Sequence, residues 1–178
     1  FEAPSFEKGK QATLIFDGAM SHARVYVNGK EAGYWPYGYN SFHLDVTPYL
    51  KAGEINELAV RLENENESSR WYPGAGLYRN VHLVVTEDAY VPTWGTHVTT
   101  PVVKDKFAKV HVETNWTMPK GKKISEYTIT TEILNPEGKK VNADTRPGDE
   151  LDETLFTQEF IVRNPMLWSV ENPHLYTA

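Results

Sequence analysis

The 178-residue sequence contains no cysteine. This absence excludes a disulfide framework, a thiolate metal site and a cysteine nucleophile, because each of them needs the sulfur atom. The sequence also lacks any apolar run that approaches the roughly 20 residues needed to span a bilayer. We therefore expect no membrane partner, and the sequence leaves the periplasm and the cytoplasm both open as compartments.

Basic residues are too few and too scattered for a nucleic-acid-binding protein. Lys and Arg total 18 against 24 Asp and Glu, which leaves a net charge of −6. Recognition of nucleic acid requires Lys and Arg clustered on one face. The nearest approach is the Lys-rich stretch at residues 120–123, which contains Gly121 and indicates a solvated hairpin tip. We expect no nucleic-acid partner.

The motifs of common catalytic and cofactor sites are also missing. The sequence has neither the nucleophile elbow G-x-S-x-G nor a phosphate-binding glycine loop. Its six histidines form no H-x-x-x-H pair, and the acidic stretch at residues 142–153 lacks the spacing of a calcium loop. We interpret that stretch as a solvated loop. We predict no catalytic residue, no metal and no cofactor in this chain.

Where the sequence does carry a pattern, the pattern has a period of two residues. Apolar residues alternate in residues 12–16 and 22–27, and the second run leads directly into Asn28-Gly29. Because Asn and Gly tolerate the positive φ angles of a type I′ turn, this dipeptide predicts a β-hairpin. No window shows a convincing helical period, so the predicted fold class is all-β. Further strands are predicted at residues 41–45, 56–62, 78–86, 96–99, 108–114, 127–134 and 157–162.

The strand pattern breaks near residues 87–95, where turn residues and Pro92 interrupt it. Short strands at regular spacing with turn residues between them indicate β-sandwiches. We therefore expect two domains, at residues 1–90 and 91–178. A self-contained jelly roll has about eight strands, whereas only about five are predicted before the break. We expect the first domain to be incomplete at its N-terminus.

Aromatic residues are abundant, at 12% of the chain with five Trp and ten Tyr. Four of them, Tyr34, Trp35, Tyr37 and Tyr39, lie between two predicted strands. Aromatic rings suit both sugar rings and protein interfaces, so composition alone does not decide their role. The alternatives are a sugar-stacking platform and a loop packed against its own domain or a neighbouring one, and we favour the packed loop.

Four stretches carry a recognisable pattern, namely VYVNGK at residues 25–30, GYNSFHLDVT at 38–47, SRWYPGAGLYRNV at 69–81 and NPMLWSVENPHLY at 164–176. Together they resemble glycoside hydrolase family 2, the family of β-galactosidases, β-glucuronidases and β-mannosidases. The last two are the specific ones, and all four occur in the family's order. The resemblance implies a galactose-binding-like jelly-roll sandwich followed by an immunoglobulin-like β-sandwich. The WYPG form looks most like the β-galactosidase-type members.

The resemblance also implies that the catalytic centre lies elsewhere. Family members are retaining enzymes, and their two catalytic Glu residues, about 5 Å apart, lie on a (β/α)8 barrel after the immunoglobulin-like domain. This chain has no βαβα pattern and is shorter than a barrel domain. We therefore expect a non-catalytic accessory piece of a longer β-glycosidase, with the parent's barrel as its partner and a homo-oligomeric parent left open. An independent carbohydrate-binding module and an interaction or adhesion sandwich are the alternatives.

One loop is singled out by the same resemblance. In relatives, a loop of the first domain reaches the barrel mouth, and an acidic residue before a Gly-Ile-Tyr-Arg-like stretch touches the sugar. Arg70 stands at that position here and departs from the acidic pattern. We take Arg70, Trp71, Tyr72 and Trp35 as candidate substrate-binding residues. The alternative, which the sequence alone leads us to favour, is that Arg70, Trp71 and Tyr72 brace the interface with the barrel, since aromatic residues and Arg are frequent at interfaces.

Overall fold

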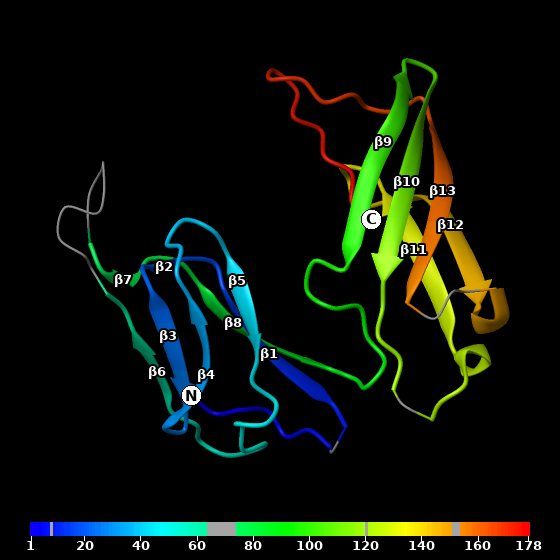
Figure 1. Ribbon diagram of the computed structural model, residues 1–178. Helices are drawn as coiled ribbons and strands as arrows, with labels where there is room; N and C mark the ends of the chain where they lie inside the picture. The colour runs from blue at the N-terminus through cyan, green and yellow to red at the C-terminus, as the bar shows by residue number, and fades with distance from the viewer. Residues whose placement is uncertain (8, 64–73, 120, 151–153) are drawn as a thin grey trace. The chain divides into compact units, whose positions relative to one another are not determined.

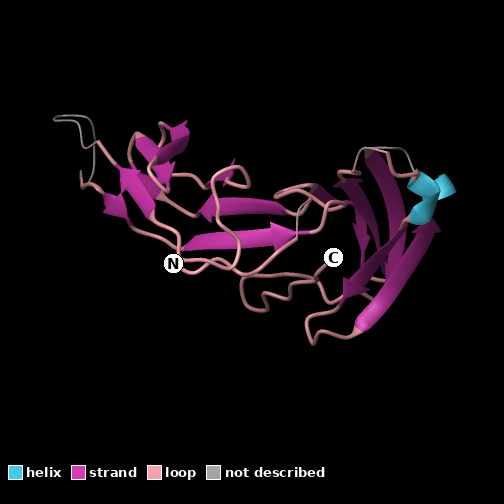
Figure 2. Cartoon of the chain, turned by 90° about the horizontal axis from the view of Figure 1, so that it is seen from below, coloured by secondary structure: helices cyan, strands magenta, loops and turns pink. Residues whose placement is uncertain are grey.

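The computed structural model describes residues 1–7, 9–63, 74–119, 121–150 and 154–178. They form two compact units, Phe1–Asp88 and Ala89–Ala178, and strands run through both of them (Figures 1 and 2). The only helices in the described ranges are two single-turn 3-10 helices in the second unit. The predicted all-β class is therefore confirmed. None of the described helices is long and apolar enough to cross a membrane.

The first unit contains two three-stranded sheets and one two-stranded sheet, ordered β5-β1-β8, β4-β3-β6 and β2-β7. Its strands are β1 (Gln11–Phe16), β2 (Ala19–Met20), β3 (Ala23–Val27), β4 (Lys30–Trp35), β5 (Phe42–Asp45), β6 (Leu58–Arg61), β7 (Gly76–Leu77) and β8 (Val81–Thr86). These eight strands exceed the five that the sequence predicted. The missed strands are β2 and β7, which have two residues each, and β4, whose burial does not alternate.

The core of the first unit lies between the sheets centred on β1 and β3. Every second residue of both strands is buried, so each strand turns one face inward. The ring of Phe42 lies between two others, with ring centroids 4.7 Å from Phe16 and 5.6 Å from Trp35. The predicted hairpin joins β3 to β4, and its turn residues Asn28 and Gly29 have the positive φ angles, 50° and 76°, that the turn requires.

The second unit consists of one three-stranded sheet, β13-β10-β9, and one two-stranded sheet, β11-β12. Its elements are β9 (Thr96–Lys104), β10 (Phe107–Asn115), η1 (Ile124–Glu126), β11 (Thr128–Leu134), β12 (Lys140–Pro147), η2 (Gly148–Glu150) and β13 (Leu155–Arg163). The interpretation of residues 142–153 as a loop is wrong for its first part, which belongs to β12. That strand pairs along β11 with almost no buried side chain, so its sequence shows no apolar alternation.

The two sheets of the second unit enclose a smaller core. Val112 of β10, Ile133 of β11 and Phe160 of β13 belong to it. The two sheets are also linked by polar contacts, since the buried Gln158 donates from its amide nitrogen to the Asp144 carboxylate over 3.0 Å. The Arg146 guanidinium, 2.8 Å from Asp144, and this amide hold the pKa of the Asp144 carboxyl below its usual value.

Candidate functional site

Arg70, Trp71 and Tyr72 lie outside the described residues, and the structure places only the two flanks of their segment. Both flanks bind the same short strip, residues 19–21. On one side, the Glu63 N–H donates to the Ser21 carbonyl over 2.9 Å, and the Ser21 hydroxyl donates to the Glu63 carbonyl over 3.0 Å. On the other side, β7 pairs antiparallel with β2. The flanks are therefore fixed side by side on one part of the first unit (Figure 1).

Tyr78 ties the second flank to the loop between β4 and β5. Its hydroxyl donates to the Gly38 carbonyl over 2.7 Å. The ring lies so close to Gly18 that a Cβ atom there would come within 2.5 Å of the Tyr78 Cζ. Gly38 in turn lies against Met20, whose sulfur would be 2.3 Å from an added Cβ. These close approaches bring the second flank of the predicted loop and the connection that carries Tyr37 and Tyr39 to the same part of the first unit.

Trp35 packs within its own domain. Its ring is half-buried against the core and stacked on Phe42, and its indole N–H donates to the Asn40 side-chain oxygen over 2.9 Å. Tyr34 precedes it on β4, and neighbouring residues of a strand face opposite sides. The Tyr34 hydroxyl lies 2.7 Å from the His22 Nδ1. The structure therefore does not bring the four aromatic residues together on one face.

Tyr37 and Tyr39 are the most exposed members of the aromatic group. They are 56% and 55% exposed, with ring centroids 5.6 Å apart and planes tilted by 58°. They flank Gly38, which contacts Met20 and accepts the hydrogen bond of Tyr78. We therefore add both tyrosines to the candidate site. The available sequence signal was the Tyr-Gly-Tyr spacing in a connection between strands, which places both rings outside the alternation of a buried strand.

A cluster of histidine and glutamate lies on the face of the second unit's larger sheet that points away from the core. His97 on β9 and His111 on β10 each lie 3.3 Å from a carboxylate oxygen of Glu113. These hydrogen bonds hold the pKa of the Glu113 carboxyl below its usual value. In the part of the chain that the structure describes, no group of three or more metal-ligating side chains is arranged to hold an ion.

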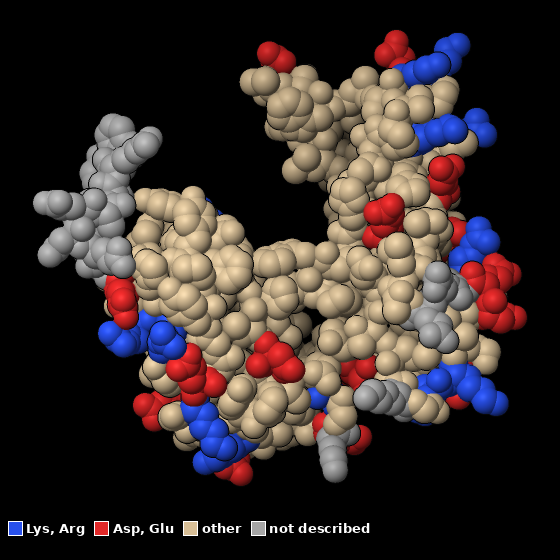
Figure 3. Space-filling view, in the orientation of Figure 1, with Lys and Arg blue, Asp and Glu red and all other residues tan. Residues whose placement is uncertain are grey.

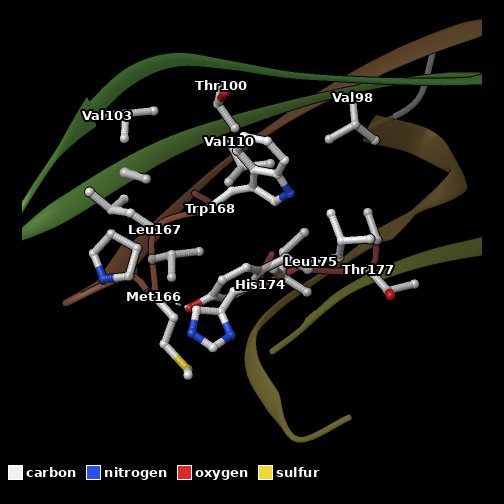
Figure 4. Close-up of a pocket in the computed structure, with 16 residues that line it drawn as sticks. Val98, Thr100, Val103, Val110, Met166, Leu167, Trp168, His174, Leu175 and Thr177 are labelled. Carbon is white, nitrogen blue, oxygen red and sulfur yellow. Dashed lines mark hydrogen bonds between the residues drawn. The ribbon is translucent and has the colours of Figure 1, made fainter. Parts of the chain in front are cut away.

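An apolar pocket of about 470 Å³ opens in the second unit between its larger sheet and the segment 165–178 (Figure 4). The sheet contributes Val98 and Val110, and the segment contributes Trp168 and Leu175. Segment 164–178 carries one charged residue, Glu171, and the part of the second unit that it forms is almost uncharged in Figure 3. Because a sugar needs several hydrogen-bonding partners, an apolar lining of this kind favours protein side chains.

The sequence matches two family models, "Glycosyl hydrolases family 2, sugar binding domain" over residues 1–87 and "Glycosyl hydrolases family 2" over residues 89–178. The chain belongs to glycoside hydrolase family 2. The predicted order of a sugar-binding jelly roll followed by an immunoglobulin-like domain is therefore confirmed, and so is the predicted family.

The relatives of this chain are much longer than the chain itself. It is 41% identical to a β-galactosidase of Bacteroides ovatus over 99% of the chain and 21% of that protein. It is 28% identical to a β-glucuronidase of Formosa agariphila, over 99% of the chain and 20% of that protein. A family 2 structure from Bacteroides cellulosilyticus matches with a TM-score of 0.84 and 34% identity, over 99% of this chain and 24% of that one. The chain therefore spans about a fifth of the length of these relatives. The names of the first two refer to enzymes that act on different sugars, a β-galactoside and a β-glucuronide.

Proposed function

We propose that these two domains are non-catalytic supports of the (β/α)8 barrel in a longer, retaining β-glycosidase of the β-galactosidase type. We further propose that the segment with Arg70, Trp71 and Tyr72 contributes to the barrel's substrate pocket. The observation that carries the second part is the anchoring of both flanks of that segment to residues 19–21. The first part rests on the match to non-catalytic family 2 domains over the whole chain.

The surface chemistry of the second unit supports a role as a buttress. Trp168 is 59% exposed and Leu175 is 71% exposed, and both line the apolar pocket. Exposed apolar patches of this kind mark sites of contact with other protein. A hydrolytic function of the chain alone would need two suitably placed carboxyl groups on a rigid scaffold. The purified 178-residue chain should therefore leave a chromogenic β-galactoside uncleaved, and measurable turnover would refute the proposal.

The anchored flanks support a role of the 70–72 stretch in the substrate pocket. Holding both ends of a loop lowers the conformational entropy that is lost when the loop binds a ligand. Within such a loop, Arg70 is suited to a carboxylate or a sugar hydroxyl, and the rings of Trp71 and Tyr72 are suited to stacking on a sugar. An arginine in place of the family's acidic residue would change which hydroxyl groups the pocket prefers.

The test uses the full-length parent enzyme and the substitution Trp71→Ala. We expect kcat/KM for a chromogenic β-galactoside to fall by about tenfold to a hundredfold, which corresponds to about 1.4–2.7 kcal/mol of transition-state stabilisation. The melting temperature should stay within about 2 °C of the wild type. Ile55→Ala, which shortens an exposed side chain elsewhere in the same domain, is the matched control. Unchanged kcat/KM in the Trp71 variant would overturn the proposed contact.

A carbohydrate-binding module is the second candidate function, and the exposed pair Tyr37 and Tyr39 favours it. Two tilted rings 5.6 Å apart can cover adjoining faces of one sugar unit. This function predicts saturable binding of an oligosaccharide by the chain, measured by titration calorimetry. Tyr37→Ala should weaken that binding about tenfold, whereas Tyr37→Phe keeps the ring and should retain it. Absence of binding to any tested β-linked glycan would remove this candidate.

A further inference from the structure

We propose that the second unit accepts one further β-strand, which pairs antiparallel with the open edge of β11 and covers the apolar inner face of β9. The occupant is the segment that follows Ala178 in the longer protein. The proposal rests on the proposed function only in requiring that the polypeptide continues beyond Ala178. It is carried by the backbone pairing of Thr177, by the hydrogen-bonding direction of β11 and by the uneven covering of the larger sheet.

The first observation is a single rung of an antiparallel ladder at one end of β11. The Leu134 N–H donates to the Thr177 carbonyl over 2.8 Å, and the Thr177 N–H donates to the Leu134 carbonyl over 3.0 Å. Two residues that exchange both bonds form the hydrogen-bonded pair of an antiparallel ladder. In the described ranges, no strand pairs with the rest of this edge of β11, whose other edge pairs with β12.

The second observation is the direction of the backbone groups along β11. In an antiparallel strand, alternate residues direct both N–H and C=O to the same neighbour. On the β12 side, the Tyr127 carbonyl accepts from Gly148 and the Asn135 N–H donates to Lys139. The odd-numbered residues therefore face β12, and Leu134 faces the other way.

It follows that the backbone groups of Thr130 and Glu132 point to the open edge. Their side chains stand on the exposed face of β11, where Thr130 bonds to the Thr145 hydroxyl and Glu132 pairs with Lys140. The edge thus keeps its N–H and C=O groups available for a ladder, the arrangement that recruits a further strand.

The third observation is that the smaller sheet covers only part of the larger one. β12 lies over β13, as the hydrogen bonds from Gln158 to Asp144 and from Asn142 to the Ile161 carbonyl indicate. β11 comes next, since its Ile133 belongs to one core cluster with Val110 and Val112 of β10, and its Thr131 hydroxyl donates to the Gln158 side-chain oxygen of β13. A third strand of the smaller sheet, beside β11 at the usual spacing of about 4.8 Å, would lie over β9. No described strand occupies that position.

The exposure of paired residues confirms this uneven covering. Val112 on β10 is fully buried, whereas its register partner Val98 on β9 is 45% exposed. Ala108 and Val103 form a second such pair, with exposures of 7% and 51%. Partners in a ladder share a face of the sheet, so Val98 and Val103 point inward, into the pocket whose other side is the irregular segment 165–178, and no described strand lies over them. Both line the pocket shown in Figure 4.

The register predicts the chemistry of the missing strand. With Thr177 opposite Leu134, Ala178 falls opposite Ile133, whose side chain points to the core, and Ala178 does line the pocket. Because side chains alternate along a strand, the second and fourth residues after Ala178 also point inward, toward β9. We therefore expect apolar side chains at these two positions and polar ones between them.

The test extends the 178-residue chain at its C-terminus by six residues, with valine at the second and fourth positions and threonine elsewhere. We expect amide hydrogen exchange of Thr130 and Glu132 to slow by at least about 100-fold relative to the unextended chain. An extension with valine at the first and third positions is the matched control, because it turns its apolar side chains outward. Equal exchange in all three chains would overturn the proposal.

Two proline variants separate edge pairing from general stability. Thr130→Pro removes an N–H that faces the open edge, so it should abolish the slower Glu132 exchange that the extension gives. In the unextended chain it removes only the exposed hydrogen bond between the Thr130 and Thr145 hydroxyls and should change the unfolding midpoint little. Thr131→Pro removes an N–H that faces β12 and should lower the unfolding midpoint of both chains. If the Glu132 amide of the extended Thr130→Pro variant stayed as protected as in the extended wild type, the assignment of this edge would be contradicted.

The natural occupant is identified by the same exchange measurement in the intact parent protein, where Thr130 and Glu132 should be protected. Exposed amides there would refute the assignment to the following segment. Concentration-dependent protection of the unextended chain, together with a dimer in light scattering, would instead assign the edge to a second copy and also refute it. These outcomes do not depend on kcat/KM of the Trp71 variant, so either proposal can fail without the other.

Discussion

Asn56 is the buried polar residue on which the connections of the first unit depend most. It is 1% exposed, and its side chain makes four hydrogen bonds. The oxygen accepts from the Lys51 N–H and the Asn28 amide, both over 2.8 Å. The nitrogen donates to the carbonyls of Lys51 and Glu54, both over 2.9 Å. The residue thereby joins the β3–β4 hairpin turn to the stretch that leads into β6.

Asn56→Ala removes all four bonds at once. Each intramolecular hydrogen bond contributes about 0.5–1.5 kcal/mol net, and a buried group that is left without a partner costs more. We therefore expect the free energy of unfolding of the first unit to fall by about 4 kcal/mol. This is a large share of the roughly 5–15 kcal/mol that holds a domain folded.

Asn56→Asp is the sharper variant because it keeps the shape of the side chain. It replaces the nitrogen that donates to two carbonyls with an oxygen that repels them, and it adds a buried charge. At pH 7 the loss should therefore exceed that of the alanine variant. Burial and the two carbonyls raise the pKa of the introduced carboxyl, so folding favours its protonated form. The stability of this variant should recover as the pH falls toward about 4.

The measurement is a urea titration in which unfolding of the first unit is monitored by the hydrogen exchange of peptides from β1 and β3. Peptides from β10 serve as an internal control, since they belong to the other compact unit. The β10 peptides should keep the wild-type midpoint in both variants. A loss below about 1 kcal/mol in the alanine variant would refute the reasoning. Equal stability of the two variants at pH 7 would refute it as well.

Two further substitutions test close packing and charge. Gly18→Ala places a Cβ 2.5 Å from the Tyr78 Cζ, so it should cost the first unit about 1–3 kcal/mol in urea unfolding; Gly76→Ala, with open space around it, should cost less than about 1 kcal/mol. In the folded protein, the pKa of the Asp144 carboxyl lies below its usual value of 3.8, and the hydrogen bond from Arg146 is the largest cause. The ionised carboxylate therefore stabilises the second unit above pH 3.8, and this stability is lost as the pH falls through the lowered pKa. Asp144→Asn removes this carboxyl. The unfolding midpoint of the second unit should then vary less between about pH 2 and 5 than in the wild type, and an unchanged pH profile would contradict the ion pair.

The strands that the sequence predicted are those with one buried face. In β10 and β13, alternate residues such as Val112 and Phe160 are buried, and that alternation is a local property of the sequence. β12 escaped prediction because its stability comes from backbone pairing with β11 and from polar side chains such as Asp144. A strand that buries almost no side chain leaves no period of two.

The candidate site was only partly predictable for a similar reason. Arg70, Trp71 and Tyr72 were chosen by family resemblance and lie outside the described residues. Trp35 was chosen because it is aromatic and lies between strands, yet its ring packs on Phe42. Tyr37 has the same local context and is exposed. Sequence context alone does not distinguish the two, because the difference arises from the β5 residue that reaches Trp35.

By itself, the sequence determined the family, the all-β class and the inward faces of the regular strands. Motif order and residue alternation are local, so they can be recognised without knowing which segments meet. Only the tertiary structure decided that the flanks of the 64–73 segment share one anchor and that β9 keeps an uncovered inner face. Both features depend on contacts between segments that are distant in sequence, such as Ser21 with Glu63 and Leu134 with Thr177. No local pattern specifies those pairs, because each forms only when separate strands have taken their places.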